Sequence, residues 1–112
     1  NEWLRFLRAL PEGMSKAQMQ SLDNTFHFTT SGNSEILFAW LMHVVSSKYE
    51  PAYPALKNFL NEIGRRKFVK PLYAEMLKSP EGTLLAKEIY KSARNNYHFI
   101  TQQTVDEMLS GK

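Results

Sequence analysis

Apolar residues recur at helical spacing along almost the whole chain, and this pattern constrains the fold more than any other feature. The clearest stretch has apolar side chains at i, i+1, i+4, i+5, i+8 and i+9, namely Ile36, Leu37, Trp40, Leu41, Val44 and Val45. The same spacing returns over residues 55–63. No segment needs a strand to explain its pattern. We therefore predict an all-α domain whose helix over residues 34–45 is central, because little of that helix surface is polar.

Caps and helix breakers divide the chain into about six or seven antiparallel helices joined by short connectors. The expected helices cover residues 2–10, 16–22, 34–45, 55–63, 71–79, 84–97 and 101–109. Ser15 and Gln18 form a capping-box pattern before the second helix, and Asn33 or Ser34 is placed to cap the third. Phe26 and Phe28 alternate with polar residues, which predicts a connector and not a strand. Trp3 and Trp40 both fall on apolar stripes, so both are predicted to lie in the core.

The composition describes one ordinary domain without disulfides. With 112 residues, of which 43% are hydrophobic, the chain is long enough to bury a core without covalent staples. It has no cysteine, which excludes a thiolate metal site and fits a reducing compartment, so we expect a cytoplasmic location. Its longest apolar run, residues 36–45, is too short to span a bilayer, and no signal-peptide pattern opens the chain. Because the sequence starts at Asn1, we expect a fragment or a processed product.

Signatures of a self-contained active site are absent from the sequence. The three histidines, His27, His43 and His98, are scattered and form no HExxH zinc helix, so we interpret them as structural or surface residues. No Gly-x-Ser-x-Gly motif or glycine-rich phosphate loop occurs. The tyrosines are compatible with a base-stacking platform, but their helical spacing favours core contacts. We predict no catalytic and no metal-binding residue in this chain.

One stretch does suggest binding chemistry. Gly64 breaks a helix, and four cations then fall within six residues: Arg65, Arg66, Lys67 and Lys70. We expect the next helix to restart near Pro71, so that its first N–H groups and the fixed charges together suit a carboxylate or phosphate. Arg65 and Lys67 alternate and are placed to reach one ligand, with Arg66 pointing elsewhere. The commoner interpretation of such a run is a group of solvated cations, favourable to the dipole of the preceding helix.

Three segments resemble a known family. Residues 33–41 (NSEILFAWL) resemble the Asn-Ser-Glu-Ile…Trp-Leu helix in the C-terminal domain of leukotriene A(4) hydrolase and its aminopeptidase relatives. Residues 64–73 (GRRKFVKPLY) resemble the Gly-Arg-x-Lys-Phe-x-(Arg/Lys)-Pro-Leu-(Phe/Tyr) segment of that domain. Residues 97–109 resemble its closing helix. The order and spacing of the three segments also agree, and the likeness is weakest before residue 30.

The resemblance implies an armadillo/HEAT-like right-handed superhelix at the end of a larger zinc aminopeptidase. Residues 1–112 would be its single C-terminal helical domain, and the N-terminal β domain and the zinc-binding catalytic domain would lie outside this chain. In that family the domain closes one side of the active-site cleft. The arginine and lysine of Gly-Arg-x-Lys, here Arg65 and Lys67, bind the free carboxylate of a short peptide substrate. Arg66 and Lys70 are then candidate auxiliary anion contacts. The implied partners are the catalytic domain of the same polypeptide and the peptide. The fragment alone would be inactive and free of cofactors.

Two departures from the family pattern and two other functions remain open. Arg66 stands where relatives often carry an uncharged residue, and the aminopeptidase B branch tends towards Lys-x-Lys where this chain has Arg65 and Lys67. Epoxide hydrolysis is not implied, because the residues that shape it would lie outside this chain. The alternative function is a stand-alone helical module for acidic or phosphorylated partners. Nucleic-acid binding ranks last, because the net charge of +3 is small, and no membrane association is expected.

Overall fold

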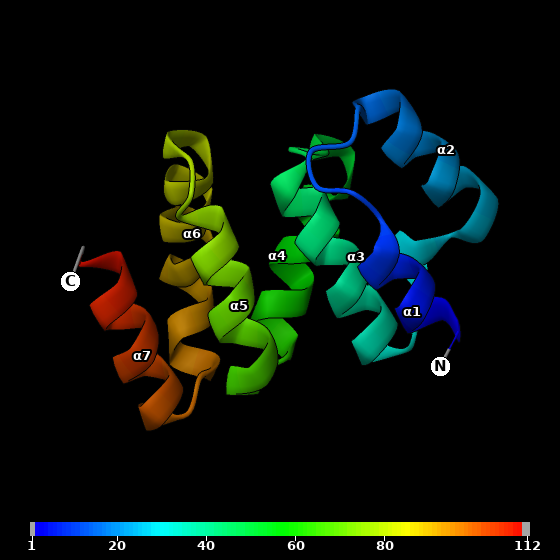
Figure 1. Cartoon of the computed structure of the whole chain (residues 1–112). Helices are drawn as coiled ribbons and strands as arrows, with labels where there is room; N and C mark the ends of the chain where they lie inside the picture. Colours follow the sequence, from blue (N-terminus) through cyan, green and yellow to red (C-terminus); the bar gives the residue numbers. More distant parts are fainter. Residues whose placement is uncertain (1, 111–112) are drawn as a thin grey trace. The chain divides into compact units, whose positions relative to one another are not determined.

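The computed structural model describes residues 2–110, and over these residues the chain is all-α, as predicted (Figure 1). It contains seven α-helices and three short 3₁₀ turns, and no strand occurs within residues 2–110. The α-helices are α1 (Glu2–Ala9), α2 (Lys16–Phe26), α3 (Ser34–Ser46), α4 (Tyr53–Glu62), α5 (Arg66–Met76), α6 (Pro80–Ala93) and α7 (Phe99–Leu109). The 3₁₀ turns are η1 (Phe28–Thr30), η2 (Glu50–Ala52) and η3 (Arg94–Asn96).

The predicted caps are present. Ser15 and Gln18 form the reciprocal capping box before α2, and the Asn33 side chain accepts from the first N–H groups of α3. No strand forms around Phe26 and Phe28, as predicted, but Phe26 belongs to α2, which continues past the expected end at residue 22; the connector begins after Phe26, and Phe28 starts the turn η1. These local signals placed the helix starts correctly because each satisfies donors that the helix itself leaves unpaired.

The chain divides into two compact units, one ending at Ala55 and the other beginning at Leu56. The core of the first unit lies where α1 packs against α3. Leu7, Trp40, Leu41 and Val44 are fully buried there. His43 is also buried, and its ring nitrogen Nε2 donates to the backbone carbonyl of Leu7, which ties α3 to α1.

Trp3 departs from the prediction that both tryptophans lie in the core. Trp40 is fully buried, whereas Trp3 is 45% exposed. The Trp3 ring packs edge-on against Phe6, Phe26 and Phe28, with ring centroids 5.2 to 6.3 Å away. Leu7 is the buried residue of α1. Because this helix has only eight residues, its apolar pattern did not show which of the apolar side chains would face α3.

The second unit packs α5 against both α6 and α7. In Figure 1 these three helices run alternately up and down, side by side. Their core includes Tyr73, Tyr90 and Tyr97, whose rings lie 5.8 to 6.5 Å apart. The tyrosines therefore make interhelical contacts in this unit. The helix predicted over residues 84–97 is displaced towards the N-terminus: α6 spans Pro80–Ala93, Tyr97 lies beyond η3, and Leu84 is 70% exposed.

The start of α5 also differs from the prediction. It begins at Arg66, not near Pro71, and Pro71 lies inside the helix. Proline lacks an N–H group, so the carbonyl of Lys67 has no helical donor four residues later. The helix continues through this defect because its apolar stripe begins before the proline. Phe68, Val69, Leu72, Tyr73 and Met76 are all buried, and their burial outweighs one lost hydrogen bond.

Gly82 gives a prediction that runs against helix propensity. It lies in the first turn of α6, where its N–H donates to the Ser79 hydroxyl. A Cβ at this position would lie 2.1 Å from the carbonyl oxygen of Met76, which belongs to the backbone and has little room to move. Although Gly→Ala in a helix normally stabilises by about 1 kcal/mol, we expect Gly82→Ala to destabilise by about 2 kcal/mol or more. Urea unfolding of the chain measures this, with Gly32→Ala as the control because that position faces open space. Equal stability of the Gly82→Ala chain and the wild type would contradict the packing described here.

Among residues 2–110 no helix has both the length and the apolar character needed to cross a bilayer.

The right-handed superhelical winding that the resemblance implies depends on how the two units are arranged, and it stays a prediction.

Candidate functional site

The basic corner, defined as Arg65, Arg66, Lys67 and Lys70, lies at the start of α5. Arg65 is the residue that precedes the helix, and its side chain makes no capping hydrogen bond. Its backbone carbonyl accepts from the N–H groups of both Phe68 and Val69, each at 3.0 Å. The N–H groups of Arg66 and Lys67 belong to the first turn, where no helical carbonyl is available to accept them. The corner therefore combines fixed cations with the positive end of a helix.

Arg65 and Lys67 converge on one aromatic ring. The guanidinium carbon of Arg65 lies 6.0 Å from the centroid of Phe68, and the ammonium of Lys67 lies 4.8 Å from it. Phe68 is itself buried and packs edge-on against Phe59, with ring centroids 5.7 Å apart. Cations attracted to an aromatic face lose some of their freedom. The structure thus brings together the two residues that the resemblance singles out, on a ring anchored in the core.

Arg66 and Lys70 line a neighbouring hollow. They are one helical turn apart on α5 and, with Lys67 and Pro71, line a shallow hollow of about 350 Å³. Lys67 is therefore shared between the ring and the hollow, whereas Arg65 does not line the hollow. The alternation expected from the sequence is therefore only partly seen: Arg65 and Lys67 share the Phe68 ring, but Lys67 also lines the hollow with Arg66.

The charges of the basic corner lower the stability of α5, because they lie at its N-terminus. All four cations are exposed, and the first turn of α5 contains no acidic residue. A cation at the N-terminus of a helix is unfavourable by about 0.3–1 kcal/mol, because the dipole there is already positive. The preceding helix, α4, ends at Glu62 and carries no basic residue in its last turn. Arg65 follows the end of α4 by three residues, so the α4 dipole favours its charge, whereas Arg66, Lys67 and Lys70 belong to α5 and gain nothing from it.

Sequence reasoning missed the side chains that hold the end of α4 and the connector that follows it. The amide of Asn96 donates to the carbonyl of Asn61 at 3.1 Å, and the hydroxyl of Thr101 donates to the carbonyl of Gly64 at 3.4 Å. Tyr97 packs so closely on Gly64 that an added Cβ would lie 3.7 Å from its ring. These contacts join positions more than 30 residues apart in the sequence, and no local pattern signals them.

Three other titratable side chains of this unit, His98, Tyr73 and Tyr97, have structural roles. His98 caps α7 through Nδ1, which accepts from the N–H of Ile100 at 3.3 Å. The hydroxyls of Tyr73 and Tyr97 lie 3.2 Å apart in the core. Burial raises the pKa of Tyr97 to about 12 and raises the pKa of Tyr73 further, so both stay protonated at neutral pH. Within residues 2–110 no three histidine, aspartate or glutamate side chains gather as a metal site would require.

Comparison with known proteins decides the family. Residues 1–109 match the family described as "Leukotriene A4 hydrolase, C-terminal". The chain belongs to this family. Its leukotriene A(4) hydrolase C-terminal domain resembles leucine aminopeptidase 2 of Neurospora crassa, with 32% identity over 97% of this chain. It is also similar to leucine aminopeptidase 2 of Phaeosphaeria nodorum (28% identity over 97% of the chain) and leucine aminopeptidase 2-2 of Scheffersomyces stipitis (38% over 73%).

The relatives are much longer than this chain. The matched segment covers 16% of the Neurospora protein, 17% of the Phaeosphaeria protein and 13% of the Scheffersomyces protein. The chain therefore spans about a sixth of the length of the curated relatives it matches.

Proposed function

We propose that this domain closes one side of the active-site cleft of its parent aminopeptidase and binds the free C-terminal carboxylate of a short peptide substrate. Arg65 is the bidentate ligand of that carboxylate, and Lys67 adds a second positive charge. Arg66 and Lys70, on the neighbouring hollow, are auxiliary contacts for anionic groups beyond the carboxylate. The domain performs no bond cleavage itself, and the isolated chain is inactive.

One observation carries this proposal. A guanidinium and an ammonium meet at the Phe68 ring, at the positive end of α5, in a position that costs the helix stability. A planar guanidinium matches the two oxygens of a carboxylate, and a lysine supplies an adaptable point charge beside it. Bound anion would offset both the repulsion between the cations and the unfavourable helix dipole. The arrangement is therefore suited to a ligand with a compact negative group.

The benefit to the reaction is positional. A peptide held at its far end by Arg65 presents its scissile bond in a restricted range of positions. Such binding energy, used at a distance from the reacting atoms, supports turnover as well as affinity. The proposed site of zinc is the catalytic domain outside this chain, because the histidine and acidic side chains of residues 2–110 do not gather into a donor set that fits the metal. We likewise propose a cytoplasmic location for the parent protein.

The alternative function, a stand-alone module for acidic or phosphorylated partners, uses the same cations. The match over residues 1–109 and the greater length of the relatives favour a domain of a larger enzyme. Binding of the isolated chain to phosphorylated and plain peptides of one sequence distinguishes the two functions. Tight, phosphate-dependent binding would favour the module.

The proposed function predicts a substrate preference of the full-length parent enzyme. A tripeptide with a free C-terminal carboxylate is expected to be cleaved with a kcat/KM about 100-fold above that of the same tripeptide with a C-terminal amide, since amidation removes the charge that Arg65 and Lys67 bind. Steady-state kinetics on the matched pair measures the ratio. A ratio near one would contradict the proposed role of the domain.

A further inference from the structure

The connector between α4 and α5, residues 63–65, is contacted by residues of η3 and of the start of α7, which lie at the same end of the second unit (Figure 1). Asn96 of η3 donates to the carbonyl of Asn61, the neighbour of the last residue of α4. Thr101 of α7 donates to the carbonyl of Gly64, and this hydrogen bond is long, at 3.4 Å. A Cβ on Gly64 would lie 3.4 Å from the carbonyl oxygen of Asn96, so the two segments already pack at contact distance. Side chains from the segment that joins α6 to α7 therefore hold the backbone just before Arg65. We call this segment, residues 94–101, the α6–α7 corner.

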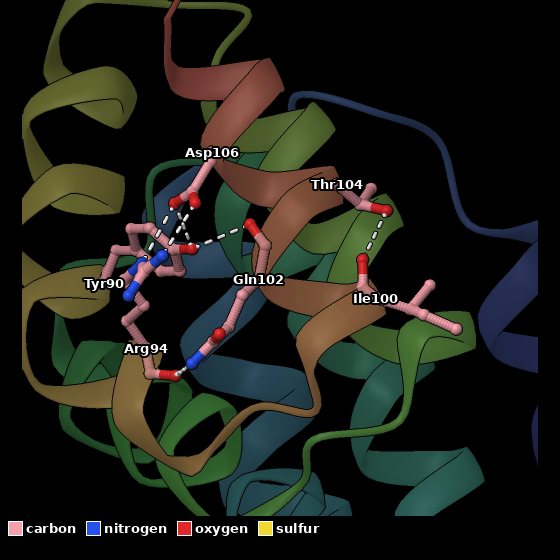
Figure 2. A network of polar contacts seen from close by, with 6 residues as sticks. All are labelled: Tyr90, Arg94, Ile100, Gln102, Thr104 and Asp106. Carbon is pink, nitrogen blue, oxygen red and sulfur yellow. Dashed lines mark hydrogen bonds and ion pairs between the residues drawn. The ribbon is translucent and has the colours of Figure 1, made fainter.

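The α6–α7 corner is in turn fastened by a polar network (Figure 2). Asp106 on α7 accepts from the Tyr90 hydroxyl at 2.6 Å and from two guanidinium nitrogens of Arg94 at 3.1 and 2.9 Å. The side-chain amide of Gln102 donates to the carbonyl of Arg94 at 2.7 Å. The hydrogen bonds from Arg94 and Tyr90 lower the pKa of Asp106 to about 2, so the carboxylate stays charged near neutral pH. This network fixes α7 next to Thr101.

The corner is also tied to the body of α5. Tyr97, between Asn96 and α7, is buried, and its hydroxyl pairs with that of Tyr73 on α5. The backbone is thus held on both sides of the Arg65 side chain. The N–H groups of Phe68 and Val69 donate to the carbonyl of Arg65, and the Thr101 hydroxyl donates to the carbonyl of Gly64, one residue earlier. A glycine next to Arg65 would otherwise leave the direction of the arginine loosely defined, because glycine accepts many backbone conformations.

We propose that Asn96 and Thr101 are positioning residues for the carboxylate clamp: they set the backbone at Gly64 and so direct the Arg65 guanidinium towards the substrate. This inference rests on the proposed function and adds the residues that make the clamp selective. A displacement of about 1 Å in a group that positions a substrate can cost about 100-fold in rate, so modest contacts at the connector have a measurable effect. The expected signature is a loss of preference for the free carboxylate, with cleavage of amidated peptides unchanged.

The test uses the full-length parent enzyme and the matched free-acid and amide tripeptides. Thr101→Val keeps the shape of the side chain but removes its donor, and it should reduce the free-acid to amide ratio of kcat/KM by about three- to tenfold. Thr101→Ser restores the hydroxyl and should return the ratio to within about twofold of the wild type. Thr104→Val is the matched control, because the Thr104 hydroxyl donates to the Ile100 carbonyl within α7 (Figure 2), whereas the Thr101 hydroxyl donates to Gly64 of the connector. It should leave the ratio unchanged.

Asn96→Ala provides a second variant, at an exposed position where loss of folding is not expected. It should lower the ratio in the same direction as Thr101→Val. If the Thr101→Val enzyme and the Asn96→Ala enzyme both keep the wild-type free-acid to amide ratio of kcat/KM, the positioning role is overturned, but the proposed role of Arg65 is not. A ratio near one in the wild-type enzyme would instead overturn the clamp, and this inference with it. Equal loss of activity on both peptides would also contradict a positioning role, because it indicates a general structural effect.

Discussion

Replacing Arg65 by alanine in the full-length parent enzyme is expected to lower kcat/KM for tripeptides with a free C-terminal carboxylate on the order of 100-fold. The arginine supplies a bidentate partner for the carboxylate, and Lys67 alone offers only a point charge. Because the interaction orients the peptide as well as binding it, kcat should fall together with the rise in KM. Steady-state kinetics on the free-acid peptide gives both constants.

Two controls separate the clamp from general charge effects. Cleavage of the C-terminally amidated peptide should be nearly unaffected by Arg65→Ala, since no carboxylate is present to be lost. Arg5→Ala removes the same charge from an exposed position outside the basic corner, and it should change kcat/KM by less than about threefold. Equal losses on the free-acid and amidated peptides, or equal effects of the Arg65 and Arg5 variants, would remove Arg65 from the proposed role.

Replacing Trp40 by alanine is expected to lower the free energy of unfolding of the chain by about 3–5 kcal/mol. Trp40 is fully buried between the elements of the first unit, and its ring lies 5.2 Å from that of Phe28. Its indole N–H also donates to the hydroxyl of Thr29 at 2.9 Å, and that hydroxyl donates to Asp23. The substitution therefore leaves a large cavity and removes one member of a polar chain. Urea unfolding followed by far-ultraviolet circular dichroism measures the loss without relying on tryptophan fluorescence.

Trp3→Ala is the matched control for the Trp40 prediction. Trp3 is the same residue type in the same unit, but it is 45% exposed. We expect a loss of about 1 kcal/mol, from its contacts with neighbouring aromatic rings. Comparable losses for the two tryptophans would contradict the burial described here.

The helical pattern predicted most of the fold because each helix carries its own local evidence. The stripe from Ile36 to Val45 is helical and central to its unit, and the cap residues Ser15 and Asn33 start their helices as expected. The cluster of four cations that starts at Arg65 was also visible, since spacing and residue type are local properties. The resemblance adds the expectation that Arg65 and Lys67 act together, and this stays a prediction.

The errors arose where tertiary packing overrides a local signal. Pro71 is usually read as a helix start, but buried residues on both sides of it carry α5 back to Arg66. Trp3 and Leu84 fall on apolar stripes, yet they are exposed because neighbouring residues take the buried side of their helices. The hydrogen bonds from Asn96 and Thr101 to the carbonyls of Asn61 and Gly64 depend on pairing between distant segments. No periodicity in one sequence reports such a contact.

The most direct test of the clamp is a crystal structure of the full-length parent enzyme with a non-cleavable tripeptide analogue that ends in a free carboxylate. The account predicts carboxylate oxygens at roughly 2.7–2.9 Å from the Arg65 guanidinium, with the Lys67 ammonium beside them. It also predicts that the hydrogen bond from Thr101 to the Gly64 carbonyl is present in the complex. A carboxylate bound by residues outside this domain, with Arg65 and Lys67 facing solvent, would contradict the account.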